Sequence, residues 1–188
     1  MITVLNHRDA SVRIEESGAG MRRIAVEARN GAFVPVRSWE TAYPVDLIEH
    51  VLRVKGVSVA DEIMRDEAPL YVQHDFRWDI LSYIQAADFA GRRVLDFGCG
   101  SGASTAVLAR MLPDSTQFVG VELEPEYVDL ARHRARYHGI DRRATFHLSP
   151  TPNHLPTDIG QFDSPVARRI ADQAFRILAV RDRVQVAE

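Results

Sequence analysis

The residues of this chain that could do chemistry gather around one glycine-rich stretch. Gly98, Gly100 and Gly102 lie in the string VLDFGCGSG at 94–102, between a short apolar run and a segment of helical pattern. Glycine has no Cβ, so such a loop lets the backbone turn sharply and approach a ligand closely. The free N–H groups at the start of the following helix face the same place. We predict a ligand-binding loop, and a tight turn without a ligand is the alternative.

Two carboxylates accompany this loop. Asp96 stands at the end of the expected strand, two residues before Gly98, and its carboxylate is expected to point into the crevice above the sheet. Glu122 follows the apolar run 118–121, about 20 residues after Gly102. An acid at that separation from a glycine loop is placed to accept hydrogen bonds from both hydroxyls of a ribose. The alternative for Glu122 is a solvated acid at the end of a strand. With the loop upstream, the pattern favours a ligand that contains a nucleoside.

The elements that must position these residues alternate between strand and helix. Apolar runs predict strands and amphipathic segments predict helices, in the order 94–97, 103–111, 118–121, 125–138 and 144–148. Such alternation is typical of βαβ units and a parallel sheet. On the second helix, Arg132, Arg134 and Arg136 are interpreted as a solvated basic face. We expect this α/β, cofactor-binding domain to occupy residues 89–188.

Residues 1–88 have a different pattern, which predicts a mostly helical N-terminal lead or cap segment. The strings at 2–5 and 21–28 could each form a strand, with a turn signal at 16–20. A small hairpin and a mobile lead-in both fit this pattern. Helices are expected from Pro44 to a stop at Gly56, after Ser58, and over 71–87. The last of these carries a polar and aromatic cluster that includes Tyr71, Gln73 and His74. These residues are candidates for a lid over the ligand, and plain packing of the helix is the alternative.

Composition excludes several classes of function. The formal net charge of −3 gives no basic surface for nucleic acid. No apolar run approaches the roughly 18 residues of a membrane span, and no secretory signal is evident. The single cysteine, Cys99, cannot form an internal disulfide, which favours a reducing, cytoplasmic location. No His/Cys cluster has the spacing of a metal site.

The strings VLDFGCGSG and VGVELEPEYVDLAR resemble motif I and its successor in class I S-adenosylmethionine-dependent methyltransferases. The resemblance covers residues from about 92 to 163 and implies a Rossmann-like parallel sheet with flanking helices. It implies that Asp96 and the glycine loop hold the methionine part of S-adenosylmethionine, that Glu122 holds the ribose, and that Leu123 packs on adenine. It also implies methyl transfer, with no metal, to an acceptor that we expect to be a small molecule.

One part of the family pattern is altered. Leu155-Pro156 and Phe162-Asp163 match a further family landmark, but the acid expected before them is absent. Thr151 or Asn153 could supply a neutral hydrogen-bonding group to the adenine instead. No catalytic residue, acceptor atom or oligomeric state is readable from the sequence.

The tail also departs from the family. Residues 164–178 have the pattern of a helix where a fourth apolar strand is expected, and 183–186 could form a last short strand. We therefore expect a sheet that is incomplete at the C-terminus, because the sequence is truncated or frame-shifted after about residue 163. The alternative is that 184–187 fill the vacant strand position.

Two other functions remain open. One is a non-catalytic remnant that binds the cofactor without turnover. The other is an NAD-dependent oxidoreductase, because Gly98, Gly100 and Ala103 also satisfy G-x-G-x-x-A. Asp96 argues against an NAD-dependent oxidoreductase, since its negative charge would repel the pyrophosphate of NAD and attract the ammonium of a methionine moiety.

Overall fold

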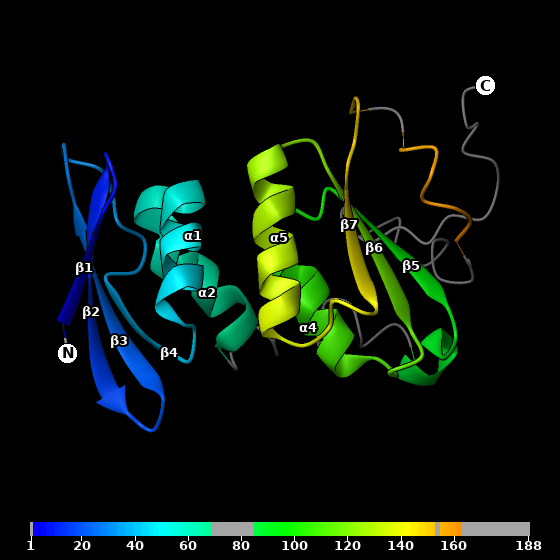
Figure 1. Cartoon of the computed structure of the whole chain (residues 1–188), viewed down its shortest axis with the longest axis horizontal. Helices are drawn as coiled ribbons and strands as arrows, with labels where there is room; N and C mark the ends of the chain where they lie inside the picture. The colour runs from blue at the N-terminus through cyan, green and yellow to red at the C-terminus, as the bar shows by residue number, and fades with distance from the viewer. Residues whose placement is uncertain (1, 69–84, 153–154, 163–188) are drawn as a thin grey trace. The chain divides into compact units, whose positions relative to one another are not determined.

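The computed structural model describes residues 2–68, 85–152 and 155–162 (Figure 1). The chain divides into two compact units, residues 1–68 and 69–188. Each unit has its own sheet, antiparallel in the first and parallel in the second. The expected domain boundary near residue 88 stays a prediction. No helix among the described residues has both the length and the apolar character needed to cross a membrane.

The first unit begins with a four-stranded antiparallel sheet in the order β1-β2-β3-β4. Its strands are β1 (Ile2–Asn6), β2 (Ala10–Gly18), β3 (Met21–Ala28) and β4 (Ser38–Thr41). Val12 and Ile14 pair with Val26 and Ile24 across β2 and β3, and all four are buried. Because strand side chains alternate between faces, this apolar set forms one face of the sheet and leaves Arg13 exposed on the other.

Two short helices complete the first unit. Helix α1 (Val45–Lys55) ends at Gly56, which has φ +53°, and helix α2 (Val59–Glu67) follows the 3₁₀ turn η1 (Gly56–Ser58). The predicted stripe of α1 is buried, with its members at Leu47, Ile48, Val51 and Leu52. Ser58 precedes α2 as predicted, but its side chain makes no capping hydrogen bond.

The described part of the lead segment contains more strands than predicted. The two strands of the expected hairpin are confirmed as β1 and β3, but β2 lies between them and β4 adds a fourth strand. The interpretation of residues 16–20 as a turn was too broad, because β2 continues to Gly18. Of the helix predicted over 71–87, residues 71–84 lie outside the described residues, and Ala86–Phe89 form a 3₁₀ turn, η3.

The second unit contains a parallel sheet in the order β5-β6-β7. The elements run β5 (Arg93–Phe97), α4 (Ala103–Met111), β6 (Gln117–Glu122), α5 (Pro125–Tyr137) and β7 (Ala144–Leu148). Each of these five elements was predicted, with ends that agree to within one residue. The α/β fold class with its parallel sheet is confirmed.

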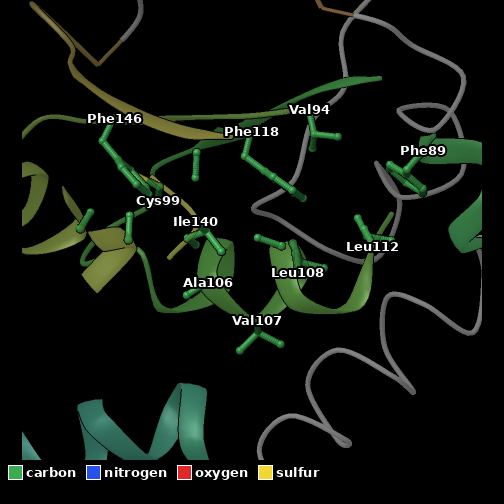
Figure 2. Packing of buried hydrophobic residues seen from close by; sticks show 14 of the residues in the cluster. Phe89, Val94, Cys99, Ala106, Val107, Leu108, Leu112, Phe118, Ile140 and Phe146 are labelled. Carbon is green, nitrogen blue, oxygen red and sulfur yellow. The ribbon is translucent and has the colours of Figure 1, made fainter. Parts of the chain in front are cut away.

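Apolar side chains cover both faces of the parallel sheet. On the helix face, Val94, Phe118 and Phe146 join a cluster with residues of α4 and α5 (Figure 2). A second cluster contains Leu95, Val119 and Val121 together with side chains from the segment after β7, namely Leu155, Ile159 and Phe162. Alternate residues of β5 and β6 thus enter different clusters, as expected for strands buried on both faces. The helix predicted over 164–178 and the strand over 183–186 lie outside the described residues.

Candidate cofactor-binding site

The glycine loop joins the end of β5 to the start of α4. Gly98, Gly100 and Gly102 all have positive φ, at +72°, +55° and +77°. The N–H groups of Gly98 and Cys99 both donate to the carbonyl oxygen of Val121, at 2.8 and 3.2 Å. These bonds place the loop over the carboxyl end of β6, where open parallel sheets bind their ligands.

The three glycines are needed for different reasons. A Cβ on Gly102 would lie 2.8 Å from the Cβ of Ala131 on α5, so this position requires both the left-handed backbone and a close approach. A Cβ on Gly98 or Gly100 would meet nothing within 4 Å. The loop is therefore tightly packed where it enters α4 and open at its first two glycines.

Glu122 lies against this loop. Its Oε2 accepts a hydrogen bond from the N–H of Gly100 at 2.8 Å, and its Oε1 accepts one from the N–H of Leu123 at 2.6 Å. Each carboxylate oxygen has two lone pairs, so both can still accept a hydroxyl. Leu123 follows with 41% of its surface exposed, which leaves an apolar side chain accessible beside the carboxylate.

Asp96 is held differently. Only 2% of its surface is exposed, and its Oδ2 accepts a short hydrogen bond, 2.6 Å, from the hydroxyl of Thr105 in the first turn of α4. The sequence suggested a carboxylate pointing into an open crevice. Instead, Asp96 is buried beneath the start of the helix, where it connects β5 to α4.

Cys99 lies in the glycine loop and is buried. Burial, and to a lesser extent the negative charges of Asp96 and Glu122, raises the pKa of its thiol far above the usual range. The Sγ lies near the Gly120 position, as does the ring of Phe146 (Figure 2). A buried thiol with a raised pKa is a poor nucleophile, and Cys99 packs as a small side chain in the turn.

For Arg134, the prediction made from the sequence was wrong. This residue was assigned to a solvated face of α5, yet its exposure is 0%. One guanidinium nitrogen, Nη1, donates to both the carbonyl oxygen and the hydroxyl of Ser101, each at 2.8 Å. Helical spacing could have revealed it, because residue 134 follows the buried Leu130 and Ala131 by four and three positions.

The segment after β7 is tied to the second acid. The N–H of Ser149 donates to the backbone carbonyl oxygen of Glu122 at 2.8 Å, and the Ser149 hydroxyl donates to the carbonyl oxygen of Thr151 at 2.7 Å. Asn153 lies outside the described residues, as do the lid candidates Tyr71, Gln73 and His74. Across the described ranges, no group of three or more His, Cys, Asp or Glu residues could hold a metal ion.

A family model described as a methyltransferase domain matches residues 88–185, slightly more than half of the chain. The chain belongs to the methyltransferase domain family. The match contains the glycine loop, Asp96, Glu122 and Leu123. It also includes residues 164–185, the tail that we expected from its sequence to depart from the family pattern.

Curated relatives of this methyltransferase domain protein include ribosomal protein L11 methyltransferases. The one from Alteromonas mediterranea is 32% identical over 79 residues, which cover 42% of this chain and 26% of the relative. The one from Azotobacter vinelandii is 37% identical over 79 residues, covering 42% and 24%. The chain thus spans about a quarter of the length of these relatives.

A solved structure with similarity to the chain is a SAM-dependent methyltransferase from Thiobacillus denitrificans in complex with S-adenosyl-L-homocysteine. It is 26% identical with a TM-score of 0.34, and the match covers 42% of this chain and 31% of that one.

Proposed function

We propose that this chain binds S-adenosylmethionine at the loop 98–102 and transfers its methyl group to a small-molecule acceptor. The observation that carries the proposal is the placement of the Glu122 carboxylate on the glycine loop, 2.8 Å from the Gly100 nitrogen, at the carboxyl end of a parallel sheet. Membership of the methyltransferase domain family supports it.

The residues present fit such a cofactor. Glu122 keeps acceptor capacity for the two ribose hydroxyls, and the exposed Leu123 next to it would pack on the adenine ring. The open side of Gly98 and Gly100 leaves room for the methionine part. The buried Asp96 would act at short range, because its negative charge favours an ammonium group near the start of α4.

When bound, the cofactor would supply a methyl group on a positively charged sulfur. The task of the protein is then to hold the cofactor in one orientation and to exclude water, since a direct displacement depends on alignment. The proposed displacement gives none of the described residues the role of a general base.

A protein acceptor is the second candidate, and the names of the curated relatives favour it. The two acceptors can be separated by measuring S-adenosylhomocysteine formation with purified ribosomal protein and, in parallel, with pools of small metabolites. If S-adenosylhomocysteine forms with the ribosomal protein and not with the metabolite pools, the small-molecule acceptor is excluded. Cofactor binding with no product in either assay would favour a non-catalytic remnant.

Titration calorimetry tests the cofactor assignment. S-adenosylhomocysteine should bind, and Glu122→Ala should weaken binding by about 1–3 kcal/mol, because a charged hydrogen bond to the ribose is lost. Glu126→Ala, an exposed acid on α5, is the matched control and should leave affinity unchanged. Binding of NAD with no binding of S-adenosylhomocysteine would overturn the proposal in favour of an oxidoreductase.

A further inference from the structure

Arg134 combines two properties that seldom occur together. It carries a permanent positive charge, and none of its surface is exposed. Arginine is rarely fully buried unless its donors are satisfied, because removing a guanidinium from water is costly. Here Nη1 donates to both acceptor oxygens of Ser101, which lies inside the glycine loop.

Helix α5 also contacts the end of the loop through a second residue. Ala131, one helical turn before Arg134, lies directly against Gly102, where a Cβ would come within 2.8 Å of the Ala131 side chain. Residues three apart on a helix share a face, so Ala131 and Arg134 contact consecutive loop residues from the same side. The loop is thus held from α5 as well as from its own flanking elements, β5 and α4.

The Ser101 contact also controls the direction of a backbone group. A carbonyl oxygen that accepts a hydrogen bond from a buried guanidinium is turned toward the protein interior. Gly102 donates its N–H to the carbonyl oxygen of Cys99 at 3.0 Å, which closes the turn. With Ser101 and Gly102 held in this way, the open side of the loop is formed by Gly98 and Gly100.

We infer that Arg134 is a positioning residue for cofactor binding, one that acts through Ser101 and does not touch the cofactor. The inference rests on the proposed function for the identity of the ligand. The guanidinium holds the loop in its binding shape before the cofactor arrives, so its loss should lower affinity by letting the loop move. Pre-organisation of this kind reduces the entropy lost on binding.

The test uses the full chain and four variants. Arg134→Met keeps an unbranched apolar stem but removes the donors, and Arg134→Lys keeps the charge. Ser101→Ala removes one of the two acceptors. Arg136→Met is the matched control, since Arg136 lies two residues further along α5 and is exposed. Calorimetry gives the affinity for S-adenosylhomocysteine, and hydrogen exchange reports on amides 98–102.

Arg134→Met should weaken S-adenosylhomocysteine binding about tenfold, while Arg136→Met stays within about twofold of the wild type. Arg134→Lys should fall between them, because an ammonium on a shorter stem cannot reproduce the planar fork. Exchange in Arg134→Met should accelerate at the loop amides more than in β5 or β6. A folded Arg134→Met with wild-type affinity, or with exchange that rises equally throughout the unit, would overturn the inference.

Ser101→Ala keeps the inference testable if Arg134→Met does not fold. It should weaken binding about threefold with little change in the unfolding temperature, and wild-type affinity in this variant would contradict a role through Ser101. If the wild type does not bind S-adenosylhomocysteine, the proposed function fails. In that case the exchange rates of Arg134→Lys at 98–102 still decide whether Arg134 holds the loop.

Discussion

The two units use their sheets in opposite ways. In the antiparallel sheet, apolar and polar residues alternate, so one face is buried and the other meets solvent. In the parallel sheet, three consecutive residues of β5 and four of β6 are buried. This is the general contrast between antiparallel and parallel sheets. Because the parallel strands are buried on both faces, functional polar groups can lie only at the ends of these strands.

Buried polar groups show the same contrast. In the first unit, the hydroxyl of Tyr43 donates to Asp66 at 2.6 Å, and both residues are buried within that unit. In the second unit, Thr105 donates to Asp96 at the same distance, but this pair lies directly below the glycine loop. The first contact stabilises a core alone, whereas the second also fixes the point where the loop enters its helix.

The largest expected effect is a loss of stability when Gly102 of the second unit is replaced, compared with the same change at Gly56 of the first unit. Gly102→Ala should cost about 2–5 kcal/mol of unfolding free energy, because a left-handed backbone of about 1–2 kcal/mol adds to overpacking of about 1–3 kcal/mol against Ala131. Gly56→Ala should cost about 1–2 kcal/mol, since its new Cβ would lie 3.1 Å from the side chain of His7, which can move. Urea denaturation measures both. Equal costs would show that the loop is not more tightly packed than the helix end.

A second pair of variants separates stability from binding. Tyr43→Phe and Thr105→Val each remove the donor to a buried carboxylate and should each cost about 1–3 kcal/mol of stability. Only Thr105→Val should also weaken S-adenosylhomocysteine binding, because only its partner lies below the loop. Thermal unfolding and calorimetry on the same preparations decide this. Loss of affinity in Tyr43→Phe would break the contrast between the units.

The smallest effect concerns Glu67, which accepts hydrogen bonds from the indole of Trp39 and the N–H of Ala42. Burial is the main reason that its pKa is raised. The folded protein therefore binds this proton more tightly than the unfolded chain does. The contribution to stability is complete below the unfolded pKa of about 4.3 and is lost as the pH rises through the raised value.

Glu67→Gln should flatten this part of the pH dependence, as measured by urea denaturation between the acid range and neutrality. Glu40→Gln, an exposed acid on β4, is a suitable control and should retain the wild-type slope. An unchanged slope in Glu67→Gln would show that another group is responsible.

Sequence patterns predicted the second unit better than the first. Apolar runs of β5, β6 and β7 are bounded by glycine, proline or helical segments, so their ends are marked locally. Strand β4 has only four residues, and β2 lies between two segments already interpreted as a hairpin. Short antiparallel strands are defined by their partners, and no local pattern reveals which strand a segment will pair with.

The glycine loop and its acids were identifiable from sequence because their spacing is itself the signal. Backbone freedom at Gly98, Gly100 and Gly102, and an acid after the next strand, are local requirements that residue type alone satisfies. The depth of Asp96 and the inward orientation of Arg134 were not identifiable in this way. A charged residue among other charged residues on a helix looks solvated until its packing partners are known.

The amino-acid sequence by itself therefore determined the order of elements in the second unit and the positions of the loop and its two carboxylates, since these follow from local backbone preference and apolar periodicity. Tertiary structure alone decided that Arg134 would be buried against Ser101 and that Glu122 would lie on Gly100. The physical reason is that burial and hydrogen-bond partnership belong to pairs of residues far apart in the chain, and only folding brings the members of each pair together.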